Sequence, residues 1–381
     1  LFFSLIIILV FYCPAALWLF LYGMNNYYMI YLFLRKIKKE TSGNLKFLEE
    51  FWSNHGKHDL PKVTTQLPVY NERHVVERLI EAVVNIDYPK GLHEIQVLDD
   101  SNDETRRMVS DLVNKYRAKG INIKHIVRDN REGFKAGALN LGLEKAEGEF
   151  LAIFDADFVP DKDFLYKTIP FFYERPKVAL VQTRWGHINR NYSLLTRAQS
   201  IGMDGHFIIE QGARAWNGLY MNFNGTAGIW RRDAVINAGG WHFDTLTEDL
   251  DLSYRAKLKG WKTKFMFDVV APSELPVDIN AYKSQQHRWA KGSIQTARKL
   301  LPQVFRTNDS LIKKIEAFIH LNQYMVHPMM IILALLSFPL IILLKSRISD
   351  MSLSFPMIGL MFLIFMGAAA PSFLYIVSQK K

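Results

Sequence analysis

The chain has 381 residues, a formal net charge of +10 and a single cysteine, Cys13. One cysteine excludes an intrachain disulfide and a zinc site built from several cysteines. The positive charge suits an anionic membrane surface or an anionic substrate. Because no nucleic-acid-binding module pattern accompanies it, we expect no nucleic-acid partner.

The N-terminal segment 1–34 carries no charged side chain. A helix of about 20 apolar residues spans a bilayer, so 1–34 is predicted to be an N-terminal transmembrane segment. It is too long for a secretory signal peptide and lacks the basic start and the cleavage pattern. Two further transmembrane helices are predicted within 326–377, at roughly 326–345 and 353–377.

The basic residues beside these segments predict their orientation. "RKIKK" at 35–39 follows the first segment and "QKK" at 379–381 follows the third. Lys and Arg concentrate on the cytoplasmic side, so the region 50–325 and the C-terminus are predicted to be cytoplasmic. The sequence therefore predicts an integral membrane protein of an inner, plasma or Golgi-type membrane. Because it starts inside an apolar run, we expect the chain to be part of a longer protein.

Between 63 and 185, short apolar runs alternate with amphipathic stretches. Strands are predicted at 63–70, 93–101, 121–128, 149–157 and 178–185, with helices at 72–86, 104–120, 134–146 and 163–175. This alternation predicts βαβ units and a mostly parallel sheet with helices on both faces. Ligands bind such sheets beyond the carboxyl ends of the strands.

Acidic side chains follow two of the predicted strands. Asp99 and Asp100 end the strand at 93–101, and Asp155 and Asp157 end the strand at 149–157. Two carboxylates spaced i and i+2 can hold one hard divalent cation, Mg²⁺ or Mn²⁺, whose remaining ligands come from substrate phosphates. Surface loops also contain such pairs, so the spacing by itself leaves both interpretations open.

Two predicted helix starts carry charged side chains. Glu248 and Asp249 follow Thr247, which can cap a helix, and the acidic pair then either supports the helix dipole or supplies a general base. Lys135 lies in the first turn after a glycine-bearing loop, a position that suits phosphate but also an ordinary helix start.

Two other stretches allow a ligand contact. Gly225 in "FNGTAG" permits close approach of the backbone to a ligand, or a simple strand bend. Gln285, Arg288 and Trp289 share one face of a predicted helix and offer an amide, a guanidinium and an indole. The alternative for the second stretch is a basic amphipathic helix that lies on lipid.

Taken together, these residues resemble the processive family 2 glycosyltransferases of the cellulose-synthase superfamily, whose pattern is a D, a DxD, a TED and a QxxRW. The matching positions are Asp100, Asp155, Asp157, Thr247, Glu248, Asp249, Gln285, Arg288 and Trp289. Stretches such as "QVLDDSND", "KAGALN", "IFDADFVP" and "FNGTAGIWR" also resemble the plant cellulose-synthase-like enzymes that build mannan, glucomannan or the glucan backbone of xyloglucan. The resemblance covers roughly residues 60–300.

The resemblance implies an α/β GT-A fold with transmembrane and interfacial α-helices. A cytoplasmic catalytic domain would occupy 50–279 and interfacial helices 280–325, before the two transmembrane helices in 326–377. It implies an inverting enzyme that polymerises a β-1,4-linked mannan, glucomannan or glucan. The donor would be GDP-mannose or UDP-glucose, and the acceptor would be the growing polysaccharide.

The resemblance also implies roles for individual residues. Asp249, beside Glu248, would be the catalytic base, and Asp157 with Asp155 would bind Mg²⁺ or Mn²⁺. The implied nucleotide contacts are Tyr70, Glu72, Asp100, Lys135, Asp155, Gln285 and Arg288. The implied acceptor contacts are Asn224, Gly225, Thr226 and Trp289.

Two alternatives remain open from the sequence. One is a transferase that adds a single sugar to a lipid, as ceramide glucosyltransferases do, and the size of the product distinguishes it from a polymerase. The other is a non-enzymatic scaffold, against which the complete set of motifs argues. No motif separates GDP-mannose from UDP-glucose.

Overall fold

The computed structural model describes residues 2–55, 60–128, 130–174, 177–345 and 351–381. Within these ranges, seven strands form one mixed sheet in the order β3-β2-β1-β4-β6-β5-β7. The strands are β1 (Val63–Val69), β2 (His93–Asp99), β3 (Ile123–Val127), β4 (Phe150–Ile153), β5 (Val178–His187), β6 (Gly228–Arg231) and β7 (Lys262–Ser273). All neighbouring pairs are parallel except those that involve β6, which runs antiparallel to β4 and β5.

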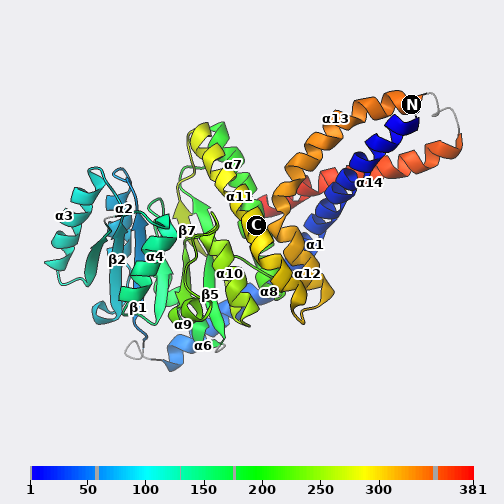
Figure 1. The fold of residues 1–381 in the computed structure, drawn as a ribbon. Coiled ribbons are helices and arrows are strands. Elements are labelled where there is room, and N and C mark those ends of the chain that lie inside the picture. The colour runs from blue at the N-terminus through cyan, green and yellow to red at the C-terminus, as the bar shows by residue number, and fades with distance from the viewer. Residues whose placement is uncertain (1, 56–59, 129, 175–176, 346–350) are drawn as a thin grey trace.

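Helices cover both faces of the sheet (Figure 1). On one face, α2 (Val76–Val84), α3 (Thr105–Arg117), α5 (Phe164–Thr168) and α6 (Phe171–Glu174) share a core with the strands. On the other face lie α4 (Phe134–Lys145), α9 (Arg232–Asn237) and α10 (Glu248–Leu258). The predicted mostly parallel α/β sheet is therefore confirmed.

Two of the expected helices differ from the structure, and the strand predicted at 149–157 is shorter, since β4 spans Phe150–Ile153. The predicted helix at 163–175 is wrong as a single element, since α5 and α6 are separated by residues 169–170. Pro170 lacks a backbone N–H and disfavours the helical conformation of the residue before it. The predicted helix at 72–86 is present but shorter, because α2 begins at Val76.

After β5, the chain forms α7 (Leu194–Asp204), the π-helix η2 (Gly205–Glu210) and α8 (Gln211–Trp216). After β7 it forms α11 (Ile279–Arg306), α12 (Leu311–Leu321), the short turn η3 (Gln323–Met325), α13 (Val326–Lys345) and α14 (Met351–Gln379). A further short turn, η1 (Lys90–Leu92), precedes β2. The QxxRW segment, residues 285–289, lies on α11, which confirms the helix predicted there.

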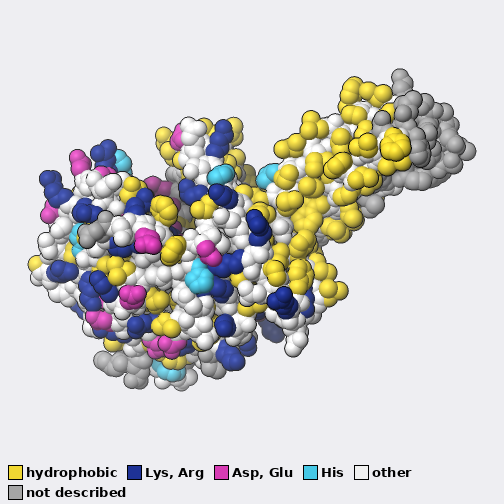
Figure 2. All heavy atoms as spheres, in the orientation of Figure 1, with side chains coloured by type: hydrophobic (Ala, Val, Ile, Leu, Met, Phe, Trp, Pro, Cys, Tyr) yellow, Lys and Arg dark blue, Asp and Glu magenta, His cyan; other side chains and the backbone are white. Residues whose placement is uncertain are grey.

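The N-terminal helix α1 (Phe2–Asn54) continues well beyond the predicted segment 1–34. Its middle part, including Met29 and Phe33, packs against α8 and β7. Its first part forms an arm with α13 and α14 that projects from the sheet domain (Figure 1). Hydrophobic side chains cover much of this arm, whereas Lys and Arg side chains are spread over the visible face of the sheet domain (Figure 2).

By length and composition, two helical stretches among the described residues are long and apolar enough to cross a membrane, Leu5–Asn54 and Gln323–Leu343. The third predicted span, 353–377, lies partly among residues whose side chains are outside the description. The apolar stretch Ile364–Gln379, which overlaps the end of this span, is shorter than a membrane-spanning helix needs to be. The third span and the predicted domain boundaries therefore stay predictions.

Candidate functional site

Most of the predicted site residues lie at one edge of the sheet. β1, β2 and β4 are parallel, so the residues after each of them reach the same edge. β6 runs antiparallel to β4, and therefore the loop that precedes β6 also meets this edge. The topology thus brings Glu72, Asp100, Asp155 and Gly225 to one side of the sheet from four separate parts of the chain.

Lys135 is the centre of the contacts at this edge. From the first turn of α4, its ammonium group donates a hydrogen bond to the carboxylate of Asp155 and another to the backbone carbonyl of Gly225, with an N–O distance of 3.0 Å. The backbone N–H of Asp155 in turn donates to the hydroxyl of Thr226 at 2.8 Å. These bonds fix the DxD turn, the helix α4 and the 224–226 loop relative to one another.

Gly225 lies between Lys135 and Asp249. Its φ of +81° is in the left-handed region, which favours glycine. A Cβ atom on Gly225 would lie 3.2 Å from Asp249 Oδ2 and 3.3 Å from Lys135 Nζ. Both side chains therefore closely approach the backbone of this loop, which a larger residue would disturb.

A serine joins the same loop to the helix that bears Asp249. The hydroxyl of Ser253 donates to the backbone carbonyl of Asp249 at 2.6 Å and accepts from the backbone N–H of Phe223 at 2.7 Å. The Asp249 side chain itself accepts a hydrogen bond from the backbone N–H of Leu250 at 2.8 Å. Asp249 is thus held in a defined orientation at the start of α10.

The capping role considered for Thr247 is wrong. Thr247 stands at the N-cap position of α10, but its side chain makes no cap hydrogen bond. Its hydroxyl lies instead 3.3 Å from the hydroxyl of Thr296 on α11. Helix capping therefore does not explain the threonine in this motif.

Burial and neighbouring charges raise the pKa values of three carboxyl groups at this edge, those of Asp157, Glu248 and Asp249. Burial and the neighbouring Asp155 carboxylate raise the pKa of Asp157 to about 7. Burial and the neighbouring Glu248 carboxylate raise the pKa of Asp249 above its ordinary value. Burial also raises the pKa of Glu248, against the opposing effects of Lys135 and of Arg288. These couplings show that the DxD and TED carboxylates and Arg288 share one electrostatic environment.

Lys135 compensates only part of this negative charge. Burial lowers its pKa, but the carboxylates of Asp155 and Glu248 outweigh that effect and raise it. Desolvation and the Asp155 carboxylate raise the pKa of Glu72, which belongs to the same group of acidic side chains. The edge is therefore an acidic site with the half-buried ammonium group of Lys135 at its centre.

Asp155 and Asp157 fit a hard divalent cation. Oxygen ligands are what Mg²⁺ and Mn²⁺ prefer, and a cation beside this pair would stabilise the charged form of Asp157, which burial and the Asp155 carboxylate disfavour. Among the described residues, a group of three His or carboxylate ligand atoms within 4.8 Å of one another occurs at His242, Asp244 and Asp251. The DxD pair belongs to no such group in the described part of the chain. A cation at the DxD pair would therefore complete its coordination with substrate oxygens.

Two of the positions expected at the nucleoside, Asp100 and Tyr70, contact arginines that the sequence analysis did not single out. Arg128 holds the Asp100 carboxylate with two hydrogen bonds, one of them 2.7 Å from Nε to Oδ1. Arg131 lies over the ring of Tyr70, 3.1 Å from its centroid. A nucleoside that reached Tyr70 would meet this guanidinium group.

The QxxRW residues lie on α11, as predicted. Gln285 and Trp289 are half-buried, and Arg288 is exposed with its Nη1 3.3 Å from the hydroxyl of Ser284. The positive charge of Arg288 lowers the pKa of Glu248 slightly, against the larger opposite effect of burial.

Asn224 makes its side-chain contacts with His206 and Asn222. Its side-chain oxygen accepts from His206 at 2.9 Å, and His206 also contacts Glu210 at 2.9 Å. His206 and Glu210 both lie on the π-helix η2, an irregular form that is frequent at functional sites. The i, i+4 spacing of His206 and Glu210 was a weak sequence signal, since it is common on helices.

Comparison with known proteins identifies the family. The model of "Glycosyltransferase like family 2" matches residues 61–292. Glucomannan 4-beta-mannosyltransferase 7 of Arabidopsis thaliana is 43% identical over 264 residues, which are 68% of this chain and 48% of that protein. Glucomannan 4-beta-mannosyltransferase 1 of Cyamopsis tetragonoloba is 43% identical over 275 residues, 71% of this chain and 52% of that protein. The chain thus spans about half the length of the curated relatives it matches.

A solved structure shares the fold. This structure is the mannosyltransferase PcManGT from Pyrobaculum calidifontis in complex with GDP-Man and Mn²⁺. It superimposes on this protein with a TM-score of 0.57 and 19% sequence identity, and the match covers 90% of this chain and 98% of the PcManGT chain. This likeness confirms the expected GT-A architecture. The matched family model covers the sheet and the carboxylates that meet at its edge, and the chain therefore belongs to glycosyltransferase family 2.

Proposed function

We propose that the chain is the catalytic part of a membrane-bound inverting glycosyltransferase that extends a β-1,4-linked mannan or glucomannan. The observation that carries the proposal is the meeting of Asp155, Lys135 and Asp249 around the loop at Gly225. The relatives named as glucomannan mannosyltransferases support the same substrate class. GDP-mannose is therefore the first donor to test, and UDP-glucose the second.

Asp249 is the proposed general base. The acceptor 4-hydroxyl attacks C1 of the α-linked donor sugar, the bond from C1 to the diphosphate oxygen breaks, and the hydroxyl proton passes to Asp249. Attack opposite the leaving group inverts C1 and forms a β-linkage. A base is most effective when its pKa is close to the working pH, which the raised pKa of Asp249 favours.

Positive groups would bind the leaving diphosphate. Lys135 is half-buried at the start of α4. Arg288, with the neutral amide of Gln285, would contact the diphosphate from α11. A cation held by Asp155 and Asp157 would supply further positive charge to the diphosphate. Charge arranged in advance around a leaving group commonly lowers a barrier by several kcal/mol.

The remaining predicted residues would bind the two ends of the substrate pair. Tyr70, Glu72 and Asp100 are proposed to contact the nucleoside. Arg128 would then orient Asp100. The acceptor is assigned to Trp289, whose indole offers an apolar face to a sugar ring, and to the loop of Asn224, Gly225 and Thr226.

The catalytic domain is proposed to face the cytoplasm of a Golgi-type or plasma membrane. The apolar stretches Leu5–Asn54 and Gln323–Leu343 support attachment to a bilayer. The basic cluster that follows 1–34 supports the orientation.

The test is product analysis with purified protein in lipid nanodiscs. GDP-mannose and UDP-glucose, each radiolabelled, are incubated separately with Mn²⁺ or Mg²⁺, and the products are sized and their linkages determined. We expect a β-1,4-linked polymer from GDP-mannose. A single sugar on a lipid would replace this proposal by a glycolipid transferase, and the absence of transfer from every donor would overturn it.

A further inference from the structure

Helix α11 carries a second set of contacts on the face that bears the QxxRW motif. These positions follow Gln285, Arg288 and Trp289 at helical spacing and are Gly292, Gln295, Thr296 and Lys299. Residues separated by three, four or seven positions share one face of a helix. With a rise of about 1.5 Å per residue, Lys299 lies roughly 15 Å along the axis from Trp289.

Gly292, Gln295 and Thr296 contact the residues that precede Glu248 and Asp249. Gln295 Oε1 accepts from the backbone N–H of Leu246 at 3.0 Å, and the Thr296 hydroxyl lies 3.3 Å from the Thr247 hydroxyl. At Gly292 the two helices are so close that a Cβ atom would lie 2.5 Å from Thr247 Cγ2. Thus α11 packs directly on the start of α10.

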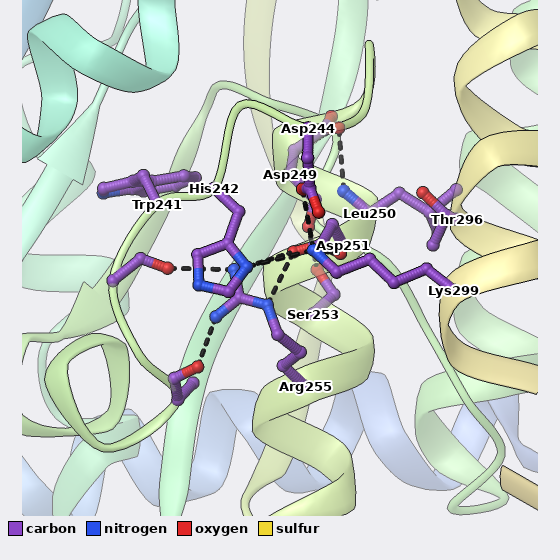
Figure 3. Close-up of polar contacts among 12 residues, drawn as sticks. Trp241, His242, Asp244, Asp249, Leu250, Asp251, Ser253, Arg255, Thr296 and Lys299 are labelled. Carbon is purple, nitrogen blue, oxygen red and sulfur yellow. Dashed lines mark hydrogen bonds and ion pairs between the residues drawn. The ribbon is translucent and has the colours of Figure 1, made fainter. Parts of the chain in front are cut away.

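Lys299 contacts three side chains near the start of α10 (Figure 3). Its ammonium nitrogen lies 2.8 Å from Asp251 Oδ2, 2.7 Å from Asp244 Oδ1 and 3.0 Å from His242 Nδ1. Asp251 is fully buried, only two residues after Asp249. Its other oxygen accepts from Arg255 Nε at 2.6 Å.

The side chains around Lys299 form an ion-pair network rather than a metal site. His242, Asp244 and Asp251 have the spacing of a cation site. Lys299, however, contacts all three, and Arg255 contacts Asp251 as well. A divalent cation among them would have to displace the ammonium group or lie beside two positive charges.

The two cations have different roles. Arg255 lies on α10, one turn after Asp251, so it compensates the buried carboxylate within its own helix. Lys299 lies on α11, so its bond to Asp251 joins two helices. Loss of Lys299 would leave Asp251 paired with Arg255 but would remove the charged link between the helices, while the contacts of Gln295 and Thr296 and the shared apolar core remain.

We propose that Lys299 is a positioning residue, which fixes the base Asp249 on α10 at a set distance from Arg288 and Trp289 on α11. This inference rests on the proposed function, in which these three residues act on one donor–acceptor pair. A base must lie within about 2.6–3.2 Å of the proton that it removes. Misplacement by about 1 Å can lower a rate roughly 100-fold.

The test compares Lys299→Met, which keeps most of the aliphatic stem, with Lys299→Arg, which keeps the charge. We expect Lys299→Met to lower kcat about 10- to 100-fold, to change KM for the sugar nucleotide less than about threefold, and to leave the midpoint of thermal unfolding close to that of wild type. Lys299→Arg should recover most of the lost kcat. Lys167→Met is the matched control, because it removes an i, i+4 ion pair with Asp163 on α5, on the other face of the sheet.

Gly292→Ala gives a second test that changes no charge, since its added methyl group would push α11 from Thr247. The same loss of kcat at nearly constant KM is expected. Wild-type kcat in Lys299→Met, or a joint loss of kcat, KM and thermal stability that Lys299→Arg does not recover, would overturn the positioning role. Absence of turnover in the wild-type chain would instead overturn the proposed function, and this inference with it.

Discussion

Replacement of Asp249 by asparagine separates catalysis from folding. Asparagine has the same shape, and its side-chain oxygen can still accept the hydrogen bond from the N–H of Leu250 at 2.8 Å. The substitution removes the proton acceptor, so Asp249→Asn should lower kcat about 10²–10⁴-fold, which corresponds to ~3–5 kcal/mol of barrier. The KM for the sugar nucleotide should change little, because Asp249 is assigned to the acceptor hydroxyl.

The same substitution should stabilise the fold near neutral pH. A carboxyl group whose pKa is raised by folding stabilises the folded state while it is protonated. That contribution is lost as the pH rises from about 4 through the folded-state pKa. Burial and Glu248 raise the pKa of Asp249 to about 8. At neutral pH the folded protein must therefore either keep this carboxyl protonated or bear a charge that burial disfavours, and Asp249→Asn removes that cost. Thermal unfolding should shift upward by a few degrees, equivalent to about 1 kcal/mol.

The assay measures initial rates of transfer from labelled donor, with thermal unfolding of the same preparations. Asp111→Asn is the control, since Asp111 is exposed on α3 and the substitution should alter neither quantity. Turnover of Asp249→Asn within a few-fold of wild type, or a loss of turnover that accompanies a lower unfolding temperature, would refute the assignment of Asp249 as base.

Three further predictions concern the same sheet edge. Lys135→Met removes the donor to Asp155 and should lower kcat/KM for the sugar nucleotide about 10- to 100-fold, measured by initial rates; unchanged kinetics would contradict it. The affinity for Mn²⁺ should rise about tenfold per pH unit up to the Asp157 pKa of about 7 and then level off, because the cation displaces a proton from Asp157. Calorimetry or electron paramagnetic resonance measures this affinity, and a pH-independent value would exclude Asp157 as a ligand. Gly225→Ala should abolish turnover, because the added methyl group would meet Asp249 and Lys135. Gly218→Ala is the control, since Gly218 also has a positive φ of +66° but has open space around it. Each substitution should lower the free energy of unfolding by about 1–2 kcal/mol, but Gly218→Ala should keep activity.

The sequence predicted the sheet where the strands are continuous apolar runs between amphipathic helices. β6 and β7 were not predicted. β6 has only four residues, and β7 begins with the polar residues "KTK" and pairs with β5 through register shifts. The antiparallel insertion of β6 between β4 and β5 also depends on tertiary pairing, which no local pattern reports.

The site was predictable where a residue follows a strand or begins a helix. Asp155 and Lys135 were placed in such positions from the sequence, and the structure brings them together beside Gly225. The partners Arg128 and Lys299 were not predicted, because each reaches its carboxylate across elements distant in the sequence. A basic side chain on a helix or loop gives no local indication of the carboxylate that it will meet.

The most direct test of the central claim is an experimental structure of the Asp249→Asn variant with GDP-mannose, Mn²⁺ and a short β-1,4-manno-oligosaccharide. We predict that the sugar diphosphate lies between Asp157 and Lys135. The acceptor 4-hydroxyl should lie within about 2.6–3.2 Å of the side chain at position 249, with a sugar ring against Trp289. An acceptor hydroxyl bound far from position 249, or a nucleotide held away from Asp157, would contradict the account.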